Sequence, residues 1–163
     1  MPVAPGMGTL NEIMEAMVSL EQTQLPTLFP TFHAFKRVPN QDEDDIPYPW
    51  SFRFPPEAET DWRHMGSGAT QPLSYTIEVA VVIGLAADPL GDLTAEAEKY
   101  ILAFLGLYYA NSRIRGTIHK IEFGRVRMGD LIVNGVRHFG PVFPIITMQQ
   151  MRFPAFPTMG PLP

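Results

Sequence analysis

The chain has no cysteine among its 163 residues, so it can form neither a disulfide nor a thiolate metal site. No Lys or Arg precedes Lys36, and the basic segment that begins a signal peptide is therefore missing. The longest uninterrupted apolar runs, Val79–Ala87 and Ile101–Ala110, are too short to span a bilayer. We therefore expect a soluble protein that is made and kept in a cytoplasm and makes no membrane contact.

Proline is absent between Leu90 and Gly140, although the chain has 17 prolines, about twice the usual share. Regular structure can run uninterrupted through that stretch, whereas the proline-rich ranges 26–56 and 141–163 should be extended, edge-like or irregular. The length fits one domain with a sizeable core, and the hydrophobic fraction of 45% is that of a globular protein.

Residues 73–110 form the most regular stretch, a long amphipathic strand followed by the longest helical pattern. Alternate residues from Leu73 to Leu85 are apolar, which is the period of a strand. Pro89 and Gly91 then interrupt the strand, and apolar residues repeat at helical spacing over about 92–110. A strand and a helix of this kind pack as two layers of one core.

A first helix is predicted over about 9–23, because Thr9 and Glu12 have the spacing of a capping box. Its apolar stripe leaves Glu15 and Glu21 outside. A short strand is expected within 32–38. Pro47–Pro56 follows as an edge strand or extended arm with aromatic residues on one face, and 57–72 reads as a long loop.

The second half of the chain predicts two or three more strands. Asn111-Ser112 is expected to end the second helix in a left-handed conformation. A strand over 117–128 has a bulge at Gly124, and Gly129-Asp130 and Asn134-Gly135 are turn candidates. A last strand is expected over 142–153.

These elements predict an α+β fold. A mixed, mostly antiparallel sheet of about four to six strands packs against the two helices, in one domain spanning 1–163. Three segments are expected to be flexible or to dock on a partner: the N-terminal arm 1–8, the loop 57–72 and the proline-rich tail 153–163. The tail carries no charge from Phe153 onward, so it is more adhesive than a solvated terminus.

The charges are segregated along the chain, whose net charge is −5. Seven acids and only one base lie within 42–61, whereas six bases, among them Arg125, Arg127 and Arg137, lie with two acids within 113–137. One interpretation is two solvated faces. The other is a pair of complementary patches that meet head-to-tail between identical subunits and close a ring.

No motif of an enzyme, metal site or cofactor site is found. A calcium loop that starts at Asn40 would need Gly at its sixth position and Glu at its twelfth, but these are Asp45 and Ser51. The four histidines lack zinc-ligand spacing, and Gly66-Ser67-Gly68 lacks the lysine of a phosphate loop. We interpret the chain as a non-enzymatic protein without a cofactor.

The order of elements resembles that of the tail-terminator and tail-completion proteins at the head-proximal end of long-tailed bacteriophage tails. The matching features are an N-terminal helix, a short strand, the proline- and aromatic-containing strand Pro47–Phe54, the long strand Leu73–Leu85, the helix 92–110 and the closing strands. The resemblance covers about residues 9–151. The loop 57–72 and the tail 154–163 of this chain are longer than expected for the family.

The resemblance implies a structural virion protein of the tail or neck, assembled in the host cytoplasm. Six copies would form a ring that terminates the tail tube and joins it to the head connector. The partners would be the tail tube protein, the connector proteins and further copies of the chain, while DNA passes through the lumen without specific binding.

Two sets of residues are candidates for these contacts. Acidic residues would let DNA slide along the lumen by repelling phosphates. The candidates are Asp42, Glu43, Asp44 and Asp45, for which a position on the outer rim is equally compatible. The candidate residues for subunit or partner contacts are Trp50, Phe52, Phe54, Arg125, Arg127, Arg137, Phe153 and Phe156.

The alternative function is a small soluble adaptor or nucleic-acid-binding module that uses the basic stretch 113–137. Arginines neutralise phosphates and the neighbouring Phe123 and Phe139 could stack on bases. The net negative charge and the lack of a recognisable reading motif count against this alternative.

Overall fold

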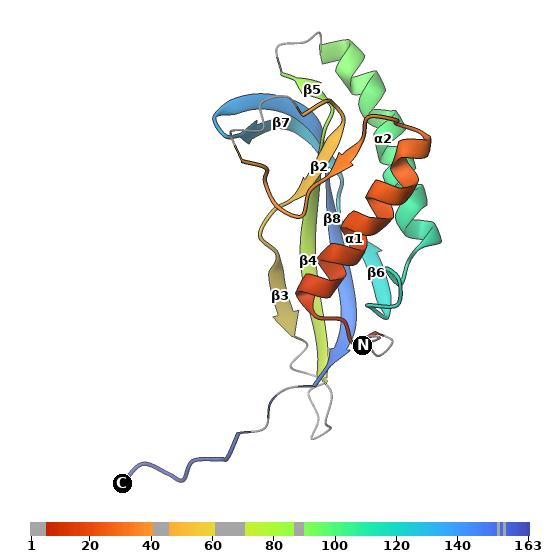
Figure 1. The fold of residues 1–163 in the computed structure, drawn as a ribbon. Coiled ribbons are helices and arrows are strands. Elements are labelled where there is room, and N and C mark those ends of the chain that lie inside the picture. The colour runs from red at the N-terminus through yellow and green to blue at the C-terminus, as the bar shows by residue number, and fades with distance from the viewer. Residues whose placement is uncertain (1–5, 41–45, 61–70, 87–89, 153, 155) are drawn as a thin grey trace.

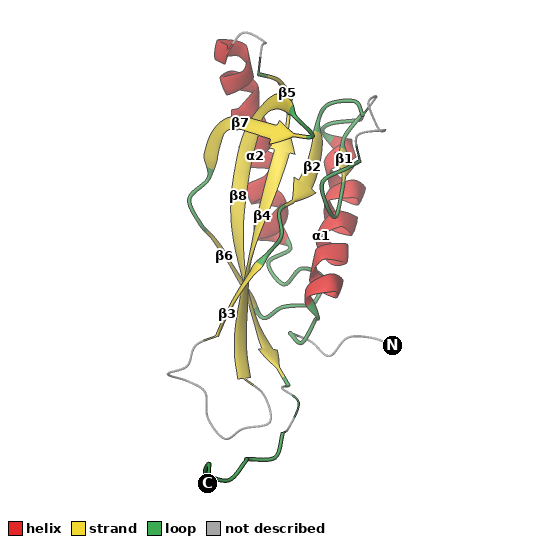
Figure 2. Cartoon of the chain, turned by 90° about the vertical axis from the view of Figure 1, so that its left-hand side faces the viewer, coloured by secondary structure: helices red, strands yellow, loops and turns green. Residues whose placement is uncertain are grey.

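The structure is a computed structural model of the chain, and it describes residues 6–40, 46–60, 71–86, 90–152, 154 and 156–163. Two α-helices, α1 (Leu10–Gln24) and α2 (Leu90–Ala110), lie on the same side of a sheet, and a short 3₁₀ helix, η1 (Leu25–Thr27), follows α1 (Figures 1 and 2). The predicted α+β class and both predicted helices are confirmed.

The capping box of α1 forms as predicted. The Thr9 amide donates to Glu12 Oε2 at 2.6 Å, and the Glu12 amide donates to Thr9 Oγ1 at 3.3 Å. These two bonds satisfy amides that the first turn of a helix leaves without intrahelical partners. Pro26 lies in η1, directly after the last turn of α1.

Two long antiparallel strands form the centre of the sheet. They are β4 (Gln71–Val82) and β8 (Val136–Met151), which pair from Gln71↔Met151 to Ala80↔Val142. Along the other side of β4 lie β2 (Trp50–Arg53) and β3 (Glu57–Thr60), both antiparallel to it. Along the other side of β8 lie β6 (Lys120–Phe123) and β7 (Arg127–Val133), again antiparallel.

Two further strands have two residues each. The strand β1 (His33–Ala34) pairs in parallel with β2, and β5 (Gly84–Leu85) continues past β4 along β8. The sheet is thus mixed and has eight strands among the described residues, against the four to six expected. The larger number arises partly because interruptions at Ile83 and at Gly124–Val126 divide expected strands into β4 and β5 and into β6 and β7. It also arises because β3 forms in a range that was expected to be a loop.

The two faces of the sheet are buried differently. Alternate residues of the central strands, such as Ile77, Val79 and Phe143, pack against both helices in the main core. The opposite residues Ala80 and Val142 belong to a smaller cluster, whose other buried members are Trp50, Phe52, Val82, Leu131 and Val133. The curled β7–β8 hairpin, at the top of the sheet in Figure 1, contributes to this second cluster, so apolar residues are buried on both faces.

Several local predictions need correction. The range 57–72 is not all loop, because 57–60 pairs with β4, while 61–70 lies outside the described residues. Gly129-Asp130 is not a turn but part of β7. Asn134-Gly135 is the turn, with φ of 50° and 80°. The left-handed residues after α2 are Ile114, Arg115 and Gly116 rather than Asn111-Ser112.

Two predicted strands have different extents. The strand expected within 32–38 is limited to His33–Ala34, and the last strand begins at Val136, earlier than expected. The proline-flanked strand β2 lies between β1 and β4 and has all four of its residues buried, so it is not an exposed edge or arm.

Candidate functional site

Three of the five predicted aromatic interface residues, Trp50, Phe52 and Phe54, pack in one row of ring contacts. Trp50 and Phe52 are 4% and 1% exposed and pack in the second cluster, so they belong to the core of this chain. Their assignment to an exposed interface is therefore corrected: a strand between two others, with apolar residues beneath it, buries its aromatic side chains. Phe54 is half-buried at the end of β2, where it packs against Phe52 with ring centroids 5.0 Å apart.

The predicted basic residues are largely compensated within the chain. Arg127 Nη1 lies 3.0 Å from Glu78 Oε1 on β4, and Arg137 forms an ion pair with Asp130 across the β7–β8 hairpin. Arg125 is exposed in the segment between β6 and β7. The three arginines are therefore not a patch of unpaired positive charge, because two of them form ion pairs with acids of the same chain.

The remaining predicted residues lie at or beyond the limits of the described structure. Asp42, Glu43, Asp44 and Asp45 lie outside the described residues, as does Phe153, so their role as lumen or contact residues stays a prediction. Phe156 is described and is 83% exposed.

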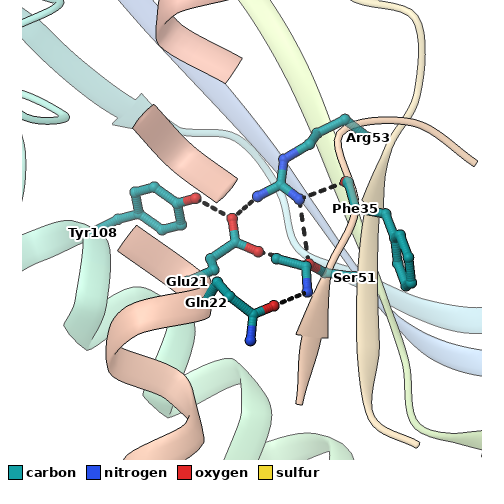
Figure 3. A network of polar contacts seen from close by, with 7 residues as sticks. Glu21, Gln22, Phe35, Ser51, Arg53 and Tyr108 are labelled. Atoms are coloured by element: carbon teal, nitrogen blue, oxygen red, sulfur yellow. Dashed lines mark hydrogen bonds and ion pairs between the residues drawn. The ribbon is translucent and has the colours of Figure 1, made fainter. Parts of the chain in front are cut away.

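A buried polar network that the sequence did not predict joins α1, β2 and α2 (Figure 3). The carboxylate of Glu21 on α1 forms an ion pair with Arg53 on β2, and both side chains are fully buried. Ser51 Oγ donates to Glu21 Oε1 at 2.7 Å, and the hydroxyl of Tyr108 on α2 donates to Glu21 Oε2. One carboxylate thus holds three elements together.

Arg53 extends this network toward the segment after β1. Its Nη1 donates to the carbonyl of Phe35 at 2.9 Å and to Ser51 Oγ at 3.3 Å. Beside it, the side chain of Gln22 accepts from the amide of Ala34 at 3.0 Å and donates to the carbonyl of Phe32 at 3.2 Å. These contacts fix the position of residues 32–35, which form little regular structure of their own.

The network holds α1, β2 and α2 in their relative positions and has no access to a substrate. Burial raises the pKa of the Tyr108 phenol above its usual range, so the hydroxyl stays protonated and donates its hydrogen bond to Glu21. Burial lowers the pKa of Arg53, yet a guanidinium beside a carboxylate stays charged at neutral pH. Since Glu21, Ser51 and Tyr108 are all 0% exposed, no substrate reaches this carboxylate.

The spacing of residues along the first helix could have revealed that Glu21 is buried. It lies four residues after Met17 and seven after Met14, which are both buried, so it shares their helix face. Ser51 and Arg53 alternate with Trp50 and Phe52, and a strand buried on both faces must place them in the core on the helix side. The prediction that Glu21 lies outside the buried stripe is wrong.

A surface groove lies next to this network. Its walls are formed by the first turns of α1 with Leu10 and Met14, by Val38, and by Phe54–Pro56 after β2. Its volume is about 630 Å³. The described lining also contains three cations, Lys36, Arg37 and Arg53, together with Asn11, and no acid is among these described residues.

Arg53 contributes both to the groove lining and to the network. Its Nη2 is occupied by Glu21, but its Nε is buried without a hydrogen-bond partner in the described part of the chain. Lys36 donates to Asn11 and lies 3.3 Å from Glu15, and this contact lowers the pKa of Glu15. The described lining of the groove is therefore mostly apolar, and two of its three cations, Lys36 and Arg53, are paired with acids of their own chain.

The C-terminal tail is the most exposed apolar segment of the described chain. Phe156, Met159 and Leu162 are 83%, 89% and 94% exposed. The tail leaves the end of β8 and extends away from the helices and the sheet (Figures 1 and 2). None of the residues that line the groove belongs to this tail.

No group of three His, Asp or Glu side chains is placed as a metal ion would require within the described ranges. Within the same ranges, no helix is both long enough and apolar enough to cross a membrane.

Comparison with known proteins places the chain in no family. No protein-family model matches it, and no curated protein matches its sequence significantly.

Proposed function

We propose that this chain is a structural subunit of a bacteriophage tail or neck, which forms a ring that terminates the tail tube and joins it to the head connector. The observation that carries the proposal is the succession of elements: an N-terminal helix, a long central strand, a second helix on the same face of the sheet, and closing antiparallel strands. This succession agrees with the resemblance drawn from the sequence over residues 9–151.

The exposed apolar tail supports a role in assembly. Phe156, Met159 and Leu162 are exposed to solvent, and covering them with a partner would lower the free energy of the system. The side chains of the tail are uncharged, so burying them against a partner carries no cost of desolvating a charged side chain. A subunit that is completed by neighbouring chains would carry such a segment, and six copies arranged head-to-tail would cover six tails.

The ion pairs within the chain change the expected nature of the contact between subunits. Arg127 and Arg137 have acidic partners in their own chain, so less positive charge is left for a neighbour. We therefore infer that apolar contacts supply more of the ring's stability than the segregated charges do. Screening by salt weakens exposed charge pairs but strengthens or spares apolar contacts.

Light scattering on the purified protein tests the ring. We expect a discrete species of about six times the chain mass of 18.2 kDa, which persists when sodium chloride is raised from about 0.15 M to about 1 M. Negative-stain images of the same sample should show rings with an open centre. A monomer at every concentration, also in the presence of assembled tail tubes, would refute the proposal.

The alternative, a nucleic-acid-binding module, makes the opposite prediction. It requires DNA binding that falls steeply with salt and is lost when Arg125 and Arg127 are replaced by glutamine. We expect no binding of labelled duplex DNA at low or moderate salt. Salt-sensitive binding that these two substitutions abolish would favour the alternative over the ring.

A further inference from the structure

We propose that the groove beside α1 binds the proline-rich tail 154–163 of a second copy of the chain. This inference rests on the proposed function, because the contact can form only where two copies of the chain associate. It adds the specific contact: which segment of one subunit enters which surface of the next.

The composition of the tail favours an extended ligand. Its four prolines, Pro154, Pro157, Pro161 and Pro163, favour the polyproline II conformation, which pays little further conformational entropy on binding. The spacing of Pro154 and Pro157 is that of the proline-rich segments that dock in aromatic-lined grooves. The three large apolar side chains of the tail have no cover in their own chain.

The groove has the complementary shape and chemistry. Leu10, Met14 and Val38 on one side and Phe54 with two prolines on the other form apolar walls. Phe54 is the aromatic residue of the described lining, and aromatic side chains line the grooves in which proline-rich segments dock. The volume of about 630 Å³ matches the size of common ligand pockets, which a few side chains of such a segment fill.

Hydrogen bonding adds a second match. Proline has a carbonyl acceptor but no amide donor, so the tail has an excess of acceptors. The described lining of the groove has the reverse excess, because the side chains of Lys36 and Arg37 are donors only and no acid is among these described residues.

The geometry points to a second copy as the source of the tail. In both views the tail continues beyond the end of β8 and away from α1, whose first turns form one wall of the groove. A tail that leaves one subunit and enters the groove of the next is a heterologous contact, and such contacts repeat around a ring.

The absence of cysteine makes a cross-linking test direct. One chain carries Val38→Cys in the groove wall, and a second carries Met159→Cys in the tail; both positions are exposed, at 40% and 89%, so folding is preserved. The two proteins are mixed under mild oxidation, and covalent heterodimers are measured on a non-reducing gel. Leu28→Cys, which is 65% exposed outside the groove, replaces Val38→Cys in the control mixture.

We expect heterodimers to form at least about tenfold faster in the Val38→Cys mixture, because docking raises the effective concentration of the two thiols. A synthetic peptide of residues 154–163 should suppress this cross-link. Equal rates with Leu28→Cys, or no effect of the peptide, would overturn the inference. Suppression by a peptide of the acidic residues 40–46 but not by the tail peptide would also overturn it and assign the groove to another occupant.

The two proposals fail separately. A ring in light scattering without the cross-link would leave the proposed function standing and overturn the groove contact. A selective cross-link in a sample that forms only dimers or open chains would support the groove contact and overturn the ring.

Discussion

Replacement of Arg53 by methionine should destabilise the fold strongly, because it leaves the carboxylate of Glu21 buried without its cation. Both side chains are fully buried, and removal of one partner from such a pair costs about 3–5 kcal/mol. That is a large part of a typical stability of about 5–15 kcal/mol. For a chain of this length it lowers the melting temperature by about 6–20 °C.

A second substitution separates the charge effect from the loss of packing. Ser51 and Tyr108 donate to different oxygens of Glu21, and Gln at position 21 is uncharged but keeps one oxygen that can accept one of these two bonds. The double variant Glu21→Gln with Arg53→Met should therefore recover at least about 1 kcal/mol relative to Arg53→Met alone, as expected for directly coupled residues. Urea unfolding followed by circular dichroism gives the free energies of all four members of the cycle.

The pH dependence gives an independent check. In Arg53→Met the buried carboxyl of Glu21 is favoured in its neutral form, so the folded state takes up a proton that the unfolded chain does not hold at the same pH. The folded state then binds more protons, and the deficit relative to wild type should shrink as pH falls from about 7 to about 5. Glu21→Gln with Arg53→Met should show no such change.

The control is Arg127→Met, which removes another arginine from a strand ion pair. Its pair with Glu78 is largely exposed, with 60% and 33% of the two side chains accessible, so the cost should be below about 1 kcal/mol. Equal losses for Arg53→Met and Arg127→Met, or a double variant no more stable than Arg53→Met, would refute the account of the network.

Three further predictions concern stability. Gly140→Ala should destabilise the fold by about 3 kcal/mol in urea unfolding, because its Cβ would clash with the carbonyl oxygen of Val81. Gly129→Ala, whose Cβ would meet open space, should change the free energy of unfolding by less than about 1 kcal/mol. Thr9→Ala should cost about 1 kcal/mol through loss of the capping box, and an unchanged melting temperature would contradict this. Burial lowers the pKa of His138, so the unfolded chain binds a proton at this residue more readily, and the free energy of unfolding should fall as pH drops through about 6.5. His138→Gln should flatten this pH dependence between about pH 7.5 and 5.5. An identical slope in the variant would show that His138 does not cause it.

The regular elements were predictable where one local signal was strong. The capping box fixed the start of α1, the apolar alternation revealed β4, and the unbroken helical period revealed α2. Asn134-Gly135 was found as a turn because both residues tolerate positive φ. Each of these signals lies within a few residues, so no tertiary contact is needed to recognise it.

The candidate site was less predictable because its members come together only in the folded chain. Trp50 and Phe52 look like an exposed aromatic face until β1 and the β7–β8 hairpin are placed around them. Arg127 looks free until β8 brings β7 to the same sheet as Glu78 of β4. Pairings between residues dozens of positions apart leave no periodic pattern in the sequence.

The sequence by itself determined the α+β class, the two helices, the central strand and the uncharged apolar tail. These follow from local propensity and periodicity, which act along the chain. Only the tertiary structure decided that Glu21 is buried, that Arg53 compensates it, and that an apolar groove opens beside them. Burial depends on which other elements lie above a residue, and that is settled by the packing of helices and strands distant in the sequence.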